Sequence, residues 1–199
     1  MKTNPFVAAV LLAAMVMAGC APENSLFPLY TNNDKVFDEN LLGEWRQVPA
    51  AGDTSDKDQR WVFFRDGDSF DYKTSLISLE RKGGFLAKGR LVRLGNFQFI
   101  DFEPDTTSLD NNETLVPFPF LPSHMFGRIW IEKNSVRIHF LNDDWVKQQW
   151  KDGHLTLAHA RSATDPVLNA TTEELRKFCL EHAEDKEAFS ENYELERVK

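Results

Sequence analysis

The feature that most constrains the fold is a series of short segments in which apolar and polar residues alternate, joined by turn residues. The clearest of them reads "QRWVFFRDGDSFDYKTS". Side chains of a strand point alternately to its two faces, so Trp61 and Phe63 share one face of the first strand. Asp66-Gly67 stands where the chain must reverse, and Asp-Gly suits a type I′ turn. This segment therefore predicts a β-hairpin.

Two further segments repeat this pattern. "FLAKGRLVRLGNFQFIDFE" has Gly95-Asn96 as its turn, and "MFGRIWIEKNSVRIHFL" has Lys133-Asn134. Gly89, inside the first of these strands, predicts a bulge or bend. With the short segment "HLTLAHA" we expect about eight strands. The sequence therefore predicts a mainly β fold, an antiparallel small barrel or sandwich.

Two helices are expected to interrupt this series of strands. Residues 142–153 begin with an N-capping asparagine and end in glycine, which predicts a short helix across one end of the sheet. Thr171 and Glu174 form a capping-box pattern at the start of a second helix. Cys179 and His182 fall on the apolar stripe of that helix, which predicts that it packs on the sheet with both residues in the core.

The first nineteen residues read as a leader rather than as part of the fold. Lys2 is followed by the apolar run Phe6–Met17, which is shorter than the roughly 20 residues that span a bilayer. The run ends in Met17-Ala18-Gly19-Cys20, which resembles the lipobox of bacterial lipoprotein signal peptides. This resemblance implies cleavage before Cys20 and lipidation (palmitate and other acyl chains) of that cysteine.

The resemblance also implies a location. Ala21 follows the lipidated cysteine, where an aspartate would indicate retention in the inner membrane of enteric bacteria. We therefore expect anchoring in the cell envelope, at the outer membrane and facing the periplasm. Cys179 is then the only other cysteine, so no disulfide within the mature chain is expected.

The charge of the chain bears on its partners. The formal net charge of −8 becomes −9 without the leader, which holds one lysine and no acid. An acidic domain does not favour nucleic acid or anionic headgroups through its net charge. We therefore expect no nucleic-acid partner, and attachment to the membrane through the lipidated cysteine alone.

The chain divides into four parts by composition. Residues 1–19 form the signal peptide, and 20–40 form the lipidated cysteine and a tether rich in Pro, Asn and Asp. Fully extended, that tether would reach about 70 Å. Residues 41–190 form the β domain with its C-terminal helix, and 191–199 form a charged tail.

The start of the β domain carries a family resemblance. Gly43-Glu44-Trp45, in "LLGEWRQV", resembles the first-strand motif of the lipocalin-like, or calycin, proteins. The run of hairpins and the C-terminal helix are similar to that group as well. In these proteins the tryptophan closes the bottom of the barrel, and a basic residue near the end of the last strand packs on it. Arg161 is the expected counterpart, and a different sandwich or open barrel remains the alternative.

A lipocalin-like barrel implies a small apolar or amphipathic ligand. We expect its interior lining to include five aromatic residues: Trp45, Phe63, Phe97, Phe99 and Trp130. The loop from Glu103 to His124 is long and contains "LVPFPFLPS", so Phe118 and Phe120 are expected at the mouth of the barrel. The alternative is a structural or protein-interaction lipoprotein with a filled core, whose surface contacts an envelope protein. A continuous cavity favours the first function, and a filled core with an exposed apolar patch favours the second.

Catalytic and metal-binding patterns are not found. The acidic clusters lack the spacing of a calcium loop, and the five histidines show neither HExxH nor Cys/His ligand spacing. There is no nucleophile elbow, triad signature or phosphate-binding loop. The sequence therefore predicts no metal site, no cofactor and no enzymatic activity, except through a site assembled only in three dimensions.

Overall fold

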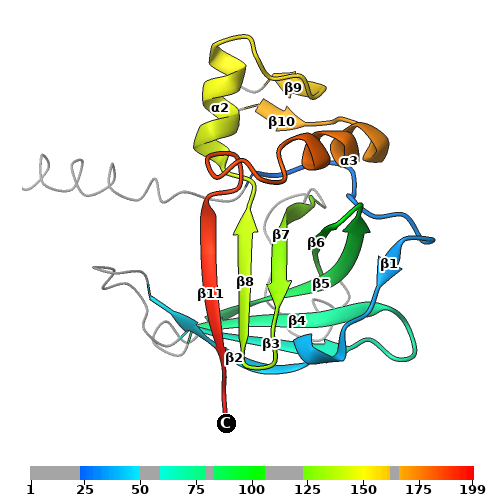
Figure 1. Cartoon of the computed structure of the whole chain (residues 1–199), viewed down its shortest axis with the longest axis vertical. Helices are drawn as coiled ribbons and strands as arrows, with labels where there is room; N and C mark the ends of the chain where they lie inside the picture. Colours follow the sequence, from blue (N-terminus) through cyan, green and yellow to red (C-terminus); the bar gives the residue numbers. More distant parts are fainter. Residues whose placement is uncertain (1–22, 50–58, 79–82, 106–122, 162–165) are drawn as a thin grey trace, which may run out of the picture.

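Eight antiparallel strands close into a barrel in the computed structural model, and a ninth strand adds to its wall (Figure 1). Each barrel strand pairs with the next along the chain, and the last pairs with the first, so the eight-stranded barrel has no free edge. The barrel strands are β2 (Gly43–Val48), β3 (Gln59–Arg65), β4 (Asp71–Ser78), β5 (Gly83–Leu94), β6 (Phe97–Pro104), β7 (Met125–Ile131), β8 (Ser135–Phe140) and β11 (Glu191–Arg197). The added strand β1 (Lys35–Val36) pairs with β5. The prediction of a mainly β fold is confirmed, and the barrel rather than the sandwich is observed.

The structure describes residues 23–49, 59–78, 83–105, 123–161 and 166–199. The leader, Cys20 and most of the Glu103–His124 loop, with Phe118 and Phe120, lie outside the described residues.

The predicted turns lie where the sequence places them. Gly67 and Gly95 have φ angles of 60° and 55°, in the left-handed region that glycine adopts without strain. The expected bulge at Gly89 is wrong, because the register of β5 with β4 and with β6 runs through that residue without interruption. Gly89 serves close packing instead: a Cβ there would lie 3.1 Å from the Phe102 ring and 3.2 Å from the Thr74 hydroxyl.

A second layer forms between β8 and β11. It consists of α2 (Asp143–Lys151), β9 (His159–Arg161), β10 (Pro166–Leu168) and α3 (Thr172–Glu181), which gather on one side of the barrel in Figure 1. Asn142 caps α2, and the Thr171–Glu174 capping box starts α3. Leu175, Phe178 and Cys179 of α3 are buried in a hydrophobic core that also contains Val92, Phe99 and Phe126 from the barrel strands. Because these barrel residues point away from the barrel interior, the molecule has two cores, one inside the barrel and one outside it.

The end of the chain differs from its predicted role as a charged tail. Residues 191–197 form β11, which pairs with β8 on one side and β2 on the other and so closes the barrel. Tyr193 and Leu195 are the apolar residues of this strand that face the interior, and polar or charged residues alternate with them. Two inward apolar residues are enough for a short closing strand, although they are too few to stand out in a charge-rich sequence.

The beginning of the domain also differs from its prediction. Residues 23–36, expected to belong to the tether, lie against the barrel. The Glu23 N–H donates to the Leu141 carbonyl, and the Leu29 N–H donates to the buried Asp101 carboxylate at 2.6 Å. Leu29 is itself fully buried in the outer core. Of the predicted tether, only the residues that precede Glu23 lie outside the described domain.

One end of the barrel is closed by Trp45, and we call it the closed end. The 3-10 helix η2 (Glu39–Leu41) crosses it, and the Trp45 indole donates to the Leu41 carbonyl. The Arg197 guanidinium lies 4.1 Å from the centroid of the Trp45 ring and donates to three backbone carbonyls, those of Asn40, Leu42 and Lys133. Arg161, the predicted partner of Trp45, belongs to β9 in the separate two-stranded sheet, because the last barrel strand is β11.

This arrangement predicts a large effect of Arg197→Gln on stability. The substitution removes the cation–π contact and leaves carbonyl acceptors of η2 and the β7–β8 turn without their donor, so the free energy of unfolding should fall by about 2 kcal/mol. Urea denaturation followed by circular dichroism measures it. Arg46→Gln is the matched control, because Arg46 forms only an exposed ion pair with Glu196, and it should change stability by less than about 0.5 kcal/mol. Equal effects of the two substitutions would contradict the role assigned to Arg197.

The docked N-terminal segment carries a buried carboxyl group. Glu23 is buried, and its Oε2 has no hydrogen-bond partner among the described residues. Burial and the neighbouring Asp143 carboxylate raise the pKa of Glu23 to about 8. Asp143 is itself paired with Lys147 at 2.5 Å, and the charge of that lysine lowers the pKa of Glu23 by less than burial raises it. Glu23 is therefore protonated in the folded chain at neutral pH.

The raised pKa of Glu23 predicts that stability decreases as pH rises. The folded chain retains the Glu23 proton up to about pH 8, whereas the unfolded chain loses it above about pH 4.5. Between pH 5 and pH 8 the folded state therefore binds one proton more, and the free energy of unfolding should fall by about 3 kcal/mol over that window. Glu23→Gln, which mimics the neutral acid, should remove this part of the dependence. Urea midpoints of both chains at pH 5 and pH 8 measure it, and parallel pH profiles would contradict the assignment.

Candidate functional site

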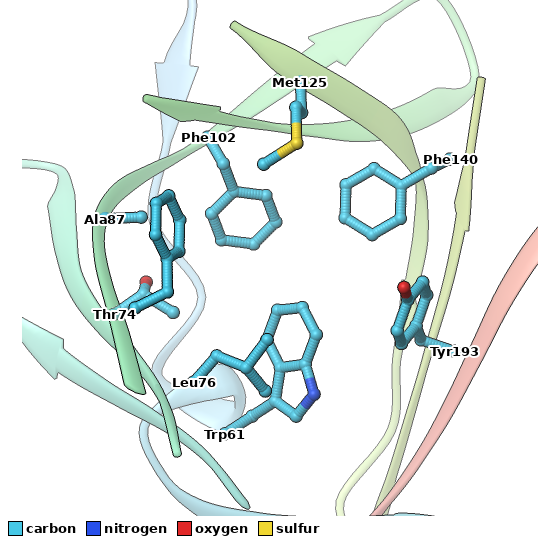
Figure 2. A pocket seen from close by; sticks show the side chains of 9 residues that line it. Trp61, Thr74, Leu76, Ala87, Phe102, Met125, Phe140 and Tyr193 are labelled. Atoms are coloured by element: carbon cyan, nitrogen blue, oxygen red, sulfur yellow. The ribbon is translucent and has the colours of Figure 1, made fainter. Parts of the chain in front are cut away.

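The interior of the barrel is filled at one end and hollow at the other. Toward the closed end the side chains pack against one another; they are Leu41, Trp45, Phe63, Tyr72, Leu91, Ile129, Val136 and Leu195. At the opposite end, which we call the open end, a pocket of about 190 Å³ remains. Figure 2 shows the side chains that surround it: Trp61, Thr74, Leu76, Phe85, Ala87, Phe102, Met125, Phe140 and Tyr193.

Strand register explains why these residues meet. Trp61 of β3, Leu76 of β4 and Phe85 of β5 are paired in a row across three neighbouring strands. Directly paired residues of antiparallel strands point to the same face, so one inward side chain fixes the direction of its partners. Thr74 and Ala87 form the next inward pair toward the closed end. The small side chain of Ala87 leaves part of the volume that a larger residue would fill.

A single unpaired hydroxyl lies in this apolar lining. The side chain of Thr74 is 4% exposed, and its Oγ1 makes no hydrogen bond with the described residues. The other polar groups of the lining do have partners. Trp61 Nε1 donates to Gln47 Oε1 at 3.2 Å, and the Tyr193 side chain has interactions of its own, including an edge-on contact with the Trp61 ring. A buried hydroxyl without a partner costs free energy, and this one is free to form a hydrogen bond within the pocket.

The chemistry of the pocket suits binding rather than acid–base catalysis. Among the described residues that line it there is no carboxylate, histidine, lysine or arginine, and Tyr193 is the only titratable one. The nearby Tyr72 belongs to the filled end, where its hydroxyl accepts from the Asp38 N–H, and burial raises its pKa to about 12. The pocket therefore offers apolar contact and one or two hydroxyl groups.

The predicted lining residues separate into three groups. Trp45 and Phe63 face the barrel interior but belong to the filled end and do not border the pocket. Phe97 and Phe99 point outward, where Phe99 meets Phe189 at 5.8 Å in the outer core. Trp130 also lies outside the barrel, between arginine side chains.

The physical reason for this difference lies in the second layer. Both faces of β6 are buried, one by the barrel interior and the other by α3 and its neighbours, so hydrophobicity does not distinguish inside from outside. Phe63 identifies the correct face of β3, and its neighbour Trp61 on that face borders the pocket. Tyr193 was assigned to the tail, and no sequence signal placed it here.

A buried histidine–aspartate pair lies outside the pocket. His124 Nδ1 is 2.8 Å from Asp101 Oδ1, and both residues are buried under the N-terminal segment. Ser25 pairs with His124 through backbone hydrogen bonds, but its hydroxyl donates to the Phe27 carbonyl. The Ser25 hydroxyl, which a Ser-His-Asp triad would need as its nucleophile, therefore bonds to the backbone and not to His124. The role of this cluster is to attach the N-terminal segment to β6.

Among the described residues, no three His, Cys, Asp or Glu side chains are placed to hold a metal ion. No helix in that part has both the length and the apolar character needed to span a bilayer. Cys179 is buried in the outer core, where burial raises the pKa of its thiol.

Comparisons with protein-family models, with curated proteins and with solved structures find no match.

The unpaired Thr74 hydroxyl predicts a gain in stability on its removal. Thr74→Val replaces the hydroxyl with a methyl group of similar size, so the free energy of unfolding should rise by about 1 kcal/mol. Thr172→Val is the matched control, because the Thr172 hydroxyl donates to the Pro28 carbonyl at 2.7 Å, and its loss should lower stability by about 1 kcal/mol. Urea denaturation of the ligand-free proteins gives both values. A destabilised Thr74→Val chain would mean that this hydroxyl has a structural partner.

Proposed function

We propose that this chain is a lipid-anchored lipoprotein of the bacterial envelope whose lipocalin-like barrel binds a small apolar or amphipathic ligand at its open end. The observation that carries the proposal is the apolar pocket of about 190 Å³ with the buried, unpaired Thr74 hydroxyl in its lining. A barrel of eight strands is wide enough to hold one small ligand once part of its interior is left unfilled.

The lipocalin-like assignment is supported by the closed end. Gly43-Glu44-Trp45 opens the first barrel strand, and Trp45 closes one end of the barrel. The resemblance implies a basic residue near the end of the last strand that packs on this tryptophan. Arg197, at the end of β11, has that position and that contact. Gly43 has a φ of 116°, and a Cβ there would lie 3.0 Å from the Arg197 guanidinium, so glycine suits both the backbone and the contact.

The pocket limits the size of the ligand. An apolar cavity of roughly 150 Å³ holds benzene in another protein, whereas drug-sized ligands need about 300 Å³ or more. A pocket of about 190 Å³ therefore suits a single ring or a short alkyl segment. The Thr74 hydroxyl favours a ligand with one hydrogen-bonding group among its apolar atoms. This combination describes a small amphipathic molecule.

The anchoring part of the proposal rests on the lipobox-like Met17-Ala18-Gly19-Cys20. Acyl chains on Cys20 would supply stable membrane attachment, since several chains hold where one alone is marginal. By analogy with enteric bacteria, the residue after Cys20 favours the outer membrane, with the barrel in the periplasm.

A second candidate function is favoured by the rim of the open end. Ile77 and Leu86 lie on the outward faces of β4 and β5 beside the pocket and are 37% and 46% exposed, and Phe85 of the pocket lining is 38% exposed. Adjacent exposed apolar side chains are typical of a surface that contacts another protein. With an empty pocket, this rim would make the chain a protein-interaction lipoprotein of the envelope.

Native mass spectrometry distinguishes the two functions. We would export the chain to the periplasm with Cys20→Ser, so that it remains unlipidated, and purify it without detergent. We expect an additional mass that organic extraction removes. Ala87→Met places a larger side chain in the pocket and should reduce ligand occupancy about fivefold or more, since affinity follows the loss of cavity contacts. Ala158→Met, at an exposed position outside the pocket, should leave occupancy unchanged.

Two results would contradict the binding function or its location. If the protein carries no additional mass and takes up neither fatty acids nor apolar dyes, the binding function is wrong. Retention of ligand by a folded Ala87→Met chain would place the ligand outside this pocket. Circular dichroism of each variant verifies that the barrel is intact.

A further inference from the structure

A second concave site lies on the outer surface of the barrel, away from the pocket. It is a cleft of about 480 Å³ between the outward side chains of β7 and β8 and residues 183–186, which follow α3. Arg128 and Trp130 of β7 line it, with Arg137 and His139 of β8. Strand register pairs Arg128 with His139 and Trp130 with Arg137, so the four side chains form one compact group.

Trp130 holds the two guanidinium groups in this cleft. The centroid of its ring lies 4.4 Å from the Arg128 guanidinium carbon and 5.2 Å from that of Arg137. The His139 ring meets the same indole edge-on at 4.7 Å. Cation–π contacts of this kind attract each arginine to the ring but do not neutralise its charge. The indole therefore holds both positive groups against a single ring.

These arginines lack carboxylate partners within salt-bridge distance. Neither Arg128 nor Arg137 forms a salt bridge with a described residue, although the chain as a whole is acidic. Arg128 donates from Nη1 to the Ala183 carbonyl, but its Nε is buried without a described partner.

The other charged groups near the cleft form no salt bridge with these two arginines among the described residues. Glu194 of β11 is the register partner of Arg137 and stands beside it on the outer face. Glu184 faces Arg128 without forming a salt bridge, and Lys186 adds a further positive charge. Asp185 accepts hydrogen bonds from the backbone N–H groups of Glu187 and Ala188 and pairs with His182 at 3.5 Å. Burial, and then the two arginines, lower the pKa of His139. Near neutral pH this histidine is uncharged and can donate or accept a hydrogen bond.

We propose that the Arg128–Arg137–His139 cleft binds a phosphate group, and that this phosphate belongs to a membrane phospholipid. The guanidinium fork matches phosphate oxygens, and two forks fixed by one ring are arranged for such a group in advance. A bound phosphate also supplies the missing acceptor charge for Arg128 and Arg137. The size of the cleft accommodates a whole headgroup rather than a bare ion.

The source of the phosphate follows from the docked N-terminus. Glu23 donates its N–H to the carbonyl of Leu141, two residues after His139 on the same outward side of that segment. Three peptide units separate Glu23 from Cys20, so their Cα atoms lie within about 11 Å of each other. A lipid on Cys20 thus keeps this part of the protein near headgroup level. This second step rests on the proposed lipidation, whereas the phosphate site itself does not.

The test uses residues 20–199 with Cys20→Ser, which contain every described contact, and follows each histidine by NMR. Inorganic phosphate should raise the pKa of His139 by about one unit, because a bound anion stabilises the imidazolium. His154, an exposed residue beyond α2, is the internal control and should not respond. Arg137→Gln should weaken the phosphate affinity about tenfold, and Arg137→Lys should restore part of it. Arg46→Gln, which removes an exposed arginine elsewhere, should bind as the parent chain does.

Vesicles then identify the source. Vesicles that contain phosphatidylglycerol should bind the parent chain, and Arg137→Gln should reduce that binding. Arg46→Gln, which removes the same charge elsewhere, should not reduce it. If inorganic phosphate shifts His139 but vesicles bind the parent and Arg137→Gln chains equally, the membrane source is wrong. An unchanged His139 pKa at tens of millimolar phosphate, or an equal shift in the folded Arg137→Gln chain, overturns the site. Neither result bears on the pocket inside the barrel, which the Ala87→Met experiment tests separately.

Discussion

The fold depends on the contact between Arg197 and Trp45, because it joins the last strand of the barrel to the first. A barrel of antiparallel strands is stable only when its edges pair, and here β11 supplies that pairing after an excursion of fifty residues from the end of β8. The Arg197 guanidinium lies on the Trp45 ring and donates to carbonyls of η2 and of the β7–β8 turn. One side chain therefore fixes the ring that fills the closed end, the helix that covers it and the strand that completes the wall.

Closure at one end explains the asymmetry of the interior. With Trp45 and the residues around it packed tightly, the remaining free volume collects at the other end, beside Ala87 and Thr74. The large aromatic content of the chain does not fill this volume, because many of the aromatic side chains serve the second core. Phe99, Phe178 and Phe189 are examples, all buried between the barrel wall and the second layer. An abundance of phenylalanine is thus compatible with a barrel that is partly hollow.

Local patterns in the sequence predicted local structure well. The turn at Asp66-Gly67, the capping box at Thr171 and the inward direction of Phe63 each depend on neighbours in the chain, and each is observed. The assignments that failed depend on long-range contacts. Phe97 was placed inside because an alternating strand has an apolar face, but the second layer provides an apolar environment outside the barrel as well. The pocket residues likewise come from seven strands, and no sequence spacing brings Thr74 and Tyr193 together.

The two ends of the barrel also differ in their relation to the N-terminus. Glu23 is attached at Leu141, the residue directly after β8, and Phe140 at the end of β8 lines the pocket. The open end and the start of the described chain therefore lie at the same end of the barrel. If Cys20 is lipidated as proposed, three peptide units leave no room for a long stalk. The pocket would then lie close to the bilayer, where small amphipathic molecules partition. A short anchor and an apolar pocket at one end of a barrel together favour exchange of a ligand with the membrane over capture from the aqueous periplasm.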